Sequence, residues 1–365
     1  MKKINLLAVA LAAFTMFSCS NEEITDLGSN APGEKATLTI RVEGAGNNVA
    51  QSRATGSAGT TTDVVINDYV VFIFRDGGAL DCPPHYSSSN AAATIADGTT
   101  AAKTAYVIAN TGVLANGPFA NVTKEADLKA VTADLMSNSN TATQTKDNLW
   151  MSGVEDITFN GTSGSVIVQL GFVAAEIELI VKDNRTNLTG GSNITITDEN
   201  VVLLYAGKSG KFFGTEAEKT TQSEFYSGDV SYITNVGSNI TESAALKDAV
   251  STAFTANAGG DVFNHFYTFG NDGATQPTIL AIQSKRTING NDEIIYYPIQ
   301  FTADDAGQTI KPGNYYTVTL TLNGDVDAGG GGGVTNPDLP LIDSSVTVTI
   351  TAASWTPVTF NKIFL

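Results

Sequence analysis

Apolar and polar residues alternate along much of the chain with a period of two, which is typical of half-buried β-strands. Within residues 36–43, Leu38, Ile40 and Val42 share one face, and Thr and charged residues occupy the other. We therefore expect a strand here, with its apolar row turned toward a core. The same pattern, or a short apolar run, predicts further strands at 64–74, 104–110, 193–206, 277–284, 293–301, 315–322, 345–351 and 356–365.

Helical spacing of apolar residues occurs in two segments, 122–136 and 242–254, and we expect a short amphipathic helix in each. Residues 165–182 form an apolar run too long for one strand, and Gly171 within it indicates a bend or a crossing between domains. Many strands, few helices and no regular alternation of the two predict an all-β, mainly antiparallel fold. We expect two β-sandwich domains that meet near residue 175.

The chain begins with two lysines and an apolar run, Ile4 to Phe17, of signal-peptide length. A small residue and Cys19 follow, and this end resembles the lipobox of bacterial lipoproteins. That resemblance implies export, loss of residues 1–18 and a lipid such as palmitate on Cys19. A plain secretory signal with an incidental cysteine is the alternative. Residues 20–35 are polar and contain Gly and Pro, so we expect a flexible tether.

Charge and cysteine content narrow the function classes. The formal net charge is −17, and a field of that sign repels nucleic acid and anionic lipid. The chain has two cysteines; if Cys19 carries lipid, Cys82 has no partner for an internal disulfide. We interpret Cys82 as a loop or core thiol rather than a reactive one.

No combination of residues carries a strong catalytic or metal-binding signal. His85 and His265 lie far apart in the sequence, and no Cys or His pair has zinc spacing. The Asp/Asn clusters at 289–293 and 304–305 do not match a calcium loop of the EF-hand type. The glycines of 329–333 lead into no helix and are typical of a linker. We therefore expect no enzyme activity, no cofactor and no metal.

The informative combination is a strand, a cleavable loop behind it and further strands at the C-terminus. The loop at 44–62 is small, polar and long enough to admit a protease, and Arg53 lies in its middle. We expect residues 36–43 to be an edge strand beside a hydrophobic groove. Cutting the loop would release this strand, and the vacated groove could take a strand from another molecule. The candidate incoming residues are Val346, Val348, Ile350, Val358 and Phe360.

Several motifs follow one another in an order that resembles the FimA-like fimbrillins of Bacteroidales, the type V pilins. Each motif alone is weak, but together they cover nearly the whole chain. They are the lipobox at Cys19, the Arg53-Ala54 step, the runs 70–74 and 106–110, the segment 311–316 and the stretch from Val346 to Trp355.

The resemblance implies export as an outer-membrane lipoprotein, cleavage by an arginine-specific protease, and donor-strand polymerisation into an adhesive surface fimbria. Cleavage would follow Arg53, so the mature pilin would start at Ala54. The resemblance also implies two transthyretin-like β-sandwich domains. The expected organisation is a signal peptide at 1–18, a propeptide at 19–53, an N-terminal domain at 54–175 and a C-terminal domain at 176–365, with the donor region at 345–365. The expected partners are other pilin subunits, the protease, and host or bacterial surface ligands.

Two other interpretations stay open. The chain could be a monomeric surface lipoprotein that binds glycan or host protein and keeps residues 36–43 permanently in its sheet. It could also be a secreted hydrolase, which would need a cleft with paired carboxylates. A stalk subunit is favoured over a basal anchor because the Arg53 loop is cleavable and a strand-forming C-terminus is present.

Overall fold

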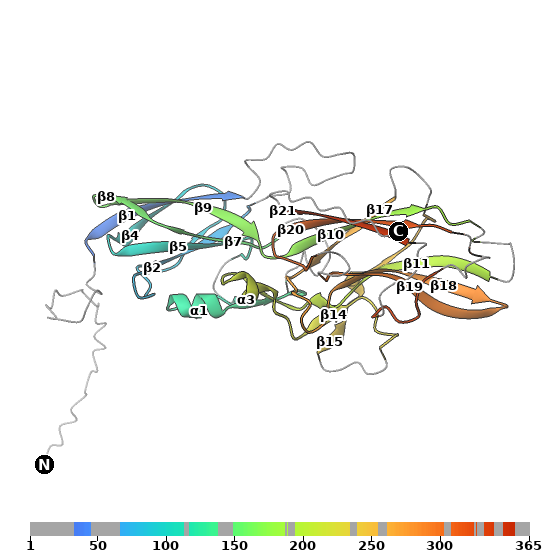
Figure 1. Ribbon diagram of the computed structural model, residues 1–365. Helices are drawn as coiled ribbons and strands as arrows, with labels where there is room; N and C mark the ends of the chain where they lie inside the picture. Colours follow the sequence, from blue (N-terminus) through green and yellow to red (C-terminus); the bar gives the residue numbers. More distant parts are fainter. Residues whose placement is uncertain are drawn as a thin grey trace, which may run out of the picture.

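The computed structural model describes residues 33–44, 66–112, 117–137, 149–186, 188, 194–233, 239–254, 261–302, 308–324, 326, 332–338 and 346–354, with the backbone alone for 261–264 and 346–354. Strands dominate these residues and most strand pairs are antiparallel, which confirms the all-β prediction. Figure 1 shows two β-sandwich halves lying end to end along one long axis.

The N-terminal half is built from eight strands, and two sheets of the sandwich share one of them, β9. The strand order is β3-β2-β5-β7-β9-β1-β4, and β8 pairs with β9 beside this path. The bounds are β1 Lys35–Gly44, β2 Tyr69–Arg75, β3 His85–Ser87, β4 Ala93–Thr99, β5 Ala102–Ala109, β7 Met151–Asp156, β8 Thr158–Asn160 and β9 Ser163–Phe172.

The central strands β2 and β5 are apolar on both faces because both faces are covered. Tyr69, Val71 and Ile73 of β2 pack into the core of the N-terminal sandwich. Phe72 and Phe74 point the other way, into a second core that is continuous with the C-terminal half. A strand buried on both faces loses the apolar–polar alternation, which explains the unbroken run in the sequence.

The C-terminal half consists of two facing four-stranded sheets, with strand orders β17-β10-β20-β21 and β16-β11-β18-β19. Their bounds are β10 Ala175–Asp183, β17 Asp261–Thr268, β20 Asn314–Leu322, β21 Val346–Ser354, β11 Ile194–Leu204, β16 Lys247–Ala249, β18 Ile279–Ile288 and β19 Asn291–Gln300. A small sheet of β12 Ala206–Gly207, β14 Phe225–Ser227 and β15 Ile240–Glu242 lies beside them.

The junction between the halves is packed rather than open. β9 ends at Phe172 and β10 begins at Ala175, and the two residues between them are buried. A two-stranded ribbon of β6 Thr132–Asp134 and β13 Ser209–Lys211 joins segments of both halves. Phe212, directly after β13, meets Phe119 and Trp150 with ring centroids 5.0 and 5.4 Å apart. The two halves therefore share one aromatic core.

Of the two predicted helices, one is shorter than expected and the other is absent from the described residues. The first is only α1 Glu125–Ala130, which is followed by strand β6. At 242–254 the prediction was wrong: β15 ends there and a single 3₁₀ turn, Ala244–Leu246, leads into β16. Leu246 is fully buried, whereas Ala249 is exposed and Val250 is half-buried, and pairing of β16 with β11 outweighs the local helical preference. A further short helix, α3 Glu216–Thr220, begins at a capping box formed by Thr215 and Glu218.

The Asp/Asn cluster at 289–293 is a hairpin turn. Asn289 and Gly290 have φ angles of 50° and 84° and connect β18 to β19. Positive φ at both central positions is the geometry of a type I′ turn, which favours Asn-Gly. Turn chemistry therefore explains these residues. The second cluster, at 304–305, lies outside the described residues.

Candidate strand-exchange site

Strand β1, the predicted leaving strand, is held on both sides. It pairs in parallel with β9 from Thr37↔Ser163 to Gly44↔Leu170, and antiparallel with β4 from Lys35↔Thr99 to Ile40↔Ala93. The expectation of an edge strand was therefore wrong. The reason is β4, whose sequence ATIADGT is small and weakly patterned and carried no strand signal.

The inward face of β1 forms part of the core of the N-terminal half. Ala36, Leu38 and Ile40 are buried, whereas Val42 is half-buried at the end of the row. Arg41 points outward and is exposed. The alternation of buried and exposed side chains that the sequence predicts for residues 36–43 is therefore present in β1. Burial of Leu38, Ile40 and part of Val42 contributes roughly 4–8 kcal/mol before entropy costs.

Leu38 enters a socket lined by glycines from both neighbouring strands. A Cβ atom at Gly98 of β4 would lie 2.5 Å from Leu38 Cδ1, and one at Gly164 of β9 would lie 2.6 Å from Leu38 Cδ2. Neither position tolerates a side chain while Leu38 is in place. Gly98 also adjoins a β-bulge in the β1–β4 pairing, where the register shifts. This socket could not be predicted from the sequence, because it forms only where three separate strands meet.

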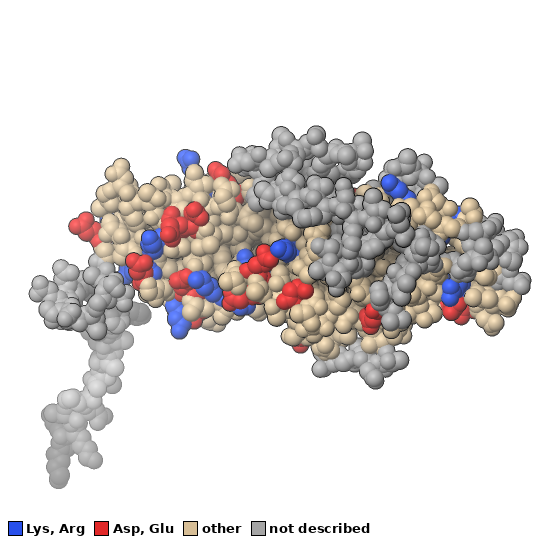
Figure 2. Space-filling model, viewed as in Figure 1, with Lys and Arg blue, Asp and Glu red and all other residues tan. Residues whose placement is uncertain are grey.

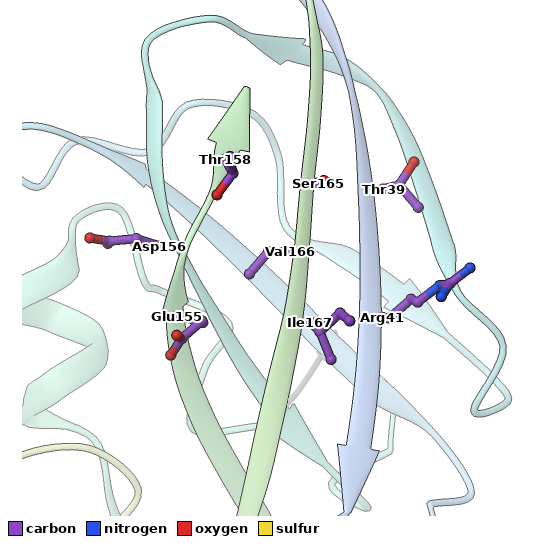
Figure 3. A pocket seen from close by; sticks show the side chains of 8 residues that line it. All are labelled: Thr39, Arg41, Glu155, Asp156, Thr158, Ser165, Val166 and Ile167. Atoms are coloured by element: carbon purple, nitrogen blue, oxygen red, sulfur yellow. The ribbon is translucent and has the colours of Figure 1, made fainter. Parts of the chain in front are cut away.

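Beside β1, the outer face of the sheet has a hollow of about 560 Å³ (Figure 3). It lies over β1, β9, the end of β7 and the start of β8. Thr39 and Arg41 come from β1, Glu155 and Asp156 come from β7, and β9 runs between the two pairs. Ile167, paired with Arg41, is 47% exposed at its rim. The hollow is wide and carries acidic, basic and apolar groups together, so it points to no single ligand class.

Strand β21 carries three of the predicted incoming residues, Val346, Val348 and Ile350. It lies at the edge of its sheet and pairs with β20 alone, with Val348 opposite Leu320 and Ile350 opposite Val318. β1 and β21 belong to different sheets, so the structure does not bring them together in one chain. An exchange between them would need a second molecule.

Several predicted site residues lie outside the described residues. They are Cys19, Arg53, Ala54, Val358 and Phe360. Their lipidation, cleavage and donor roles therefore remain predictions.

The other two side chains considered in the sequence analysis, Cys82 and His265, lie among groups that fit a structural role. Cys82 is buried, and burial together with the nearby carboxylates of Asp81 and Asp97 raises the pKa of its thiol to about 11. His265 Nδ1 lies 2.9 Å from Glu176 Oε1 across the β10–β17 pair. Within the described part of the chain, no cluster of three His, Cys, Asp or Glu side chains has metal-site geometry. In that part, no helix is long and apolar enough to cross a membrane.

Comparison with known proteins places the chain in a family. A family model for the major fimbrial subunit protein FimA matches residues 36–224, and one for the C-terminal domain of FimA-like major fimbrial subunit proteins matches residues 174–355. The chain belongs to the FimA-like family of major fimbrial subunits. Members of this family are structural subunits of cell-surface fimbriae and assemble with other pilin subunits.

Solved structures agree with this family. A candidate cell adhesion protein from Bacteroides eggerthii is 60% identical to this FimA-like chain, with a TM-score of 0.81; the match covers 90% of this chain and 98% of that one. A candidate cell adhesion protein from Parabacteroides distasonis, at 15% identity and a TM-score of 0.59, covers 90% and 99% and shares the fold. Among curated proteins, this FimA-like chain has no match.

On the side viewed in Figure 2, the acidic and basic side chains of the described residues are scattered singly or in small mixed groups.

Proposed function

We propose that this FimA-like chain is a stalk subunit that polymerises by donor-strand exchange after cleavage at Arg53. The observation that carries the proposal is the position of β1. It fills a slot between β9 and β4, it buries Leu38 and Ile40, and it precedes every other strand that the structure describes. A replacement strand from a second molecule would gain both ladders and the same apolar slot.

Pairing on both sides does not make β1 irreplaceable. No described strand precedes it, and one connection, residues 45–68, joins it to β2. When that connection is cut, β1 can leave without threading past any other element. Without the cut, the ladders and the buried side chains keep it in place. Cleavage is therefore the step that permits exchange.

The precursor is proposed to be an outer-membrane lipoprotein that carries its lipid on Cys19. Cleavage after Arg53 by an arginine-specific protease would remove the lipid and β1 together and release the mature pilin for assembly. Its partners would be further copies or related pilins, and the finished fimbria would support adhesion to host or bacterial surfaces. No nucleic acid, cofactor or catalytic role is proposed.

Substitution of the two arginines tests the cleavage step. Arg53→Ala should leave the precursor uncut and monomeric, because the proposed cleavage site is lost. Arg41→Ala is the matched control and should be processed normally, because the backbone at Arg41 is bonded to β9 inside the sheet. Mass spectrometry of assembled material should give Ala54 as the first residue; any other N-terminus contradicts the cleavage site.

Deletion of residues 346–365 tests assembly. The truncated precursor should be processed but remain as soluble monomers in electron microscopy and size-exclusion chromatography. Fibres of normal length from this variant would reject a C-terminal donor.

The alternative is a monomeric surface lipoprotein that binds glycan or host protein. Pairing of β1 on both sides favours it. In that case, mild trypsin treatment should cut the loop after β1 and leave a monomer in size-exclusion chromatography. Under the main proposal, the cut chain should assemble.

A further inference from the structure

A second hollow lies at the junction of the two halves, where the end of β9, helix α3 and the start of β20 come together (Figure 1). Its volume is about 330 Å³, and its described lining contains two lysines and one glutamate among polar and apolar groups. Sites for small ligands typically have volumes of roughly 300–1,000 Å³. The junction hollow therefore has room for one small molecule.

The charged side chains of the junction hollow are not balanced within it. Lys311 Nζ lies 2.8 Å from Glu216 Oε1, so the glutamate of the lining already has a partner. Lys219, on the same helix as Glu216, forms no ion pair with any carboxylate that the structure describes. Lys219 is half-buried, and burial lowers the pKa of its ammonium group. A carboxylate bound beside it would compensate for the lost hydration.

A glycine leaves one wall of the junction hollow open. Gly171 pairs with Ser152 across β9 and β7, so a side chain at position 171 would lie on the same side of the sheet as the Ser152 side chain. Both residues line the hollow, and a Cβ atom at Gly171 would meet no other atom within 4 Å. The missing side chain therefore provides part of the space for a ligand.

The opposite wall, formed by the turn that precedes β20, is held in place by two contacts. The Tyr316 hydroxyl accepts hydrogen bonds from the Lys311 backbone N–H at 2.7 Å and from the Asn314 side chain at 3.2 Å. Gly270 lets Pro312 approach helix α3, because a Cβ atom at Gly270 would lie 2.8 Å from Pro312 Cδ and 2.9 Å from a backbone oxygen of α3. The junction hollow is therefore preformed, which lowers the entropy cost of binding.

We infer that the junction hollow binds a sugar that carries a carboxylate, such as a uronic acid or a sialic acid, with the carboxylate beside Lys219. The inference rests on the adhesive role proposed above and deepens it, because it assigns a ligand class and a place on the chain to that role. It does not depend on cleavage or on strand exchange.

The uncharged groups of the junction hollow favour a sugar over the carboxylate of a protein. Phe172 and Pro312 supply apolar surface, and the side-chain oxygen of Asn314 accepts no hydrogen bond from the described residues. A sugar ring presents C–H groups on its faces and hydroxyl groups around its edge, so it uses both kinds of contact. An acidic side chain of a peptide would pair with Lys219 and leave the rest of the hollow unfilled. An acidic peptide is therefore the competing occupant.

Titration calorimetry on the full-length precursor tests the ligand class. Methyl glucuronide or N-acetylneuraminic acid should bind at one site per chain. Methyl glucoside, which differs from methyl glucuronide only in lacking the carboxylate, should bind at least about tenfold more weakly. Equal affinity for the glucoside overturns the role of the carboxylate. Binding of an N-acetylated glutamate peptide with no binding of either acidic sugar overturns the sugar class, and binding of none of these probes overturns the site.

Three substitutions test the place of the bound sugar. Lys219→Met should weaken binding at least about tenfold without lowering the free energy of unfolding, because it removes a half-buried charge that has no partner. Gly171→Val fills the open space with a residue that suits a strand and should abolish binding. Lys285→Met is the matched control, because Lys285 lies on β18, is 40% exposed and pairs with Glu199. Wild-type affinity in either of the first two variants overturns the site.

The titration of Lys219 gives a readout that a merely structural role would not move. Burial lowers its pKa in the free chain, and a bound carboxylate should raise this pKa by direct charge pairing. Lys311, whose charge is already paired with Glu216, should shift less. NMR of chains with isotope-labelled lysines, with and without methyl glucuronide, measures both groups. A pKa of Lys219 that does not change at saturation overturns the contact.

Assembled fibres separate this inference from the proposed function. Fibres of the Lys219→Met chain should form normally but attach to a surface coated with the acidic sugar at least about tenfold less than wild-type fibres. If wild-type fibres adhere to host cells but the precursor binds no acidic sugar, the inference fails and the adhesive role stands. If the cleaved chain forms no fibres, the proposed polymerisation fails, and calorimetry on the precursor still decides whether the junction hollow binds the sugar.

Discussion

Leu38 is the buried residue that packs most tightly between β1 and its two neighbouring strands. Its position in an alternating run could be read from the sequence, and its burial follows from that pattern. The two glycines that enclose it could not be found in this way, because they lie about 60 and 126 residues further along the chain, and only the pairing of β1 with β4 and β9 brings them together.

Truncation of this side chain should therefore be costly. Leu38→Ala should lower the free energy of unfolding of the precursor by about 2–5 kcal/mol, because it leaves a cavity in a tight socket. Thr37→Ala, on the exposed face of the same strand, should change it by less than about 0.5 kcal/mol. Urea denaturation of both variants measures the difference, and equal effects would mean that the socket does not hold β1.

The reactivity of the Cys82 thiol can be tested directly. Burial raises the pKa of its thiol to about 11, so almost none of it is thiolate at pH 8. In a chain without residues 1–19, a thiol reagent should label Cys82 only when the protein unfolds. The labelling rate should rise with urea across the unfolding transition. Rapid labelling of the folded chain would contradict this and reopen a reactive role.

At the scale of elements, strands that are apolar on at least one face were predictable and their pairing was not. The runs of Val, Ile, Leu and aromatic residues in β2 and β20 predict these strands. The sequence of β4 contains no such run. Because β4 was not predicted, β1 was expected to lie at the edge of the sheet. Sheet pairing depends on contacts between distant segments, so a weakly patterned strand becomes visible only beside its neighbours.

The short helix α1 illustrates how much a small element depends on its polar contacts. The carboxylate of Glu125 accepts hydrogen bonds from Lys129 and from the hydroxyl of Tyr106 on β5, and these contacts lower its pKa. A lower pKa in the folded state adds stability above the unfolded pKa of about 4.3, and this stability is lost as the pH falls.

Glu125→Gln should therefore lower the free energy of unfolding by about 1 kcal/mol at pH 7. The difference from wild type should shrink as the pH falls from 5 to 3, because the carboxylate becomes protonated. Glu34→Gln, at an exposed position, is the control for the change in net charge. Urea denaturation at several pH values gives the comparison, and a gap that does not change with pH would contradict this role of Glu125.

At the scale of the whole molecule, the two halves are joined by a continuous core rather than by a linker. Phe212 packs with Phe119 and Trp150, and its backbone oxygen accepts a hydrogen bond of 2.6 Å from Ser152. The sequence indicated a boundary near residue 175 but not this contact, because residues 119, 150 and 212 are far apart in the chain.

Phe212→Ala should loosen this junction. We expect a loss of about 3–5 kcal/mol and the separation of one calorimetric transition into two, because the halves no longer unfold together. Tyr232→Phe, remote from the junction, should preserve a single transition. Differential scanning calorimetry measures both, and a single transition in Phe212→Ala would show that other contacts are enough to couple the halves.

The course of β1 along the long axis of the molecule has a mechanical consequence (Figure 1). In the proposed fibre, with its subunits end to end along this axis, fluid drag would pull the subunits apart along it. A strand in the β1 slot would meet this force in shear, with the hydrogen bonds to β9 and β4 loaded together instead of opening one after another. Such a joint resists tension far better than one that peels, although its net binding energy is the same.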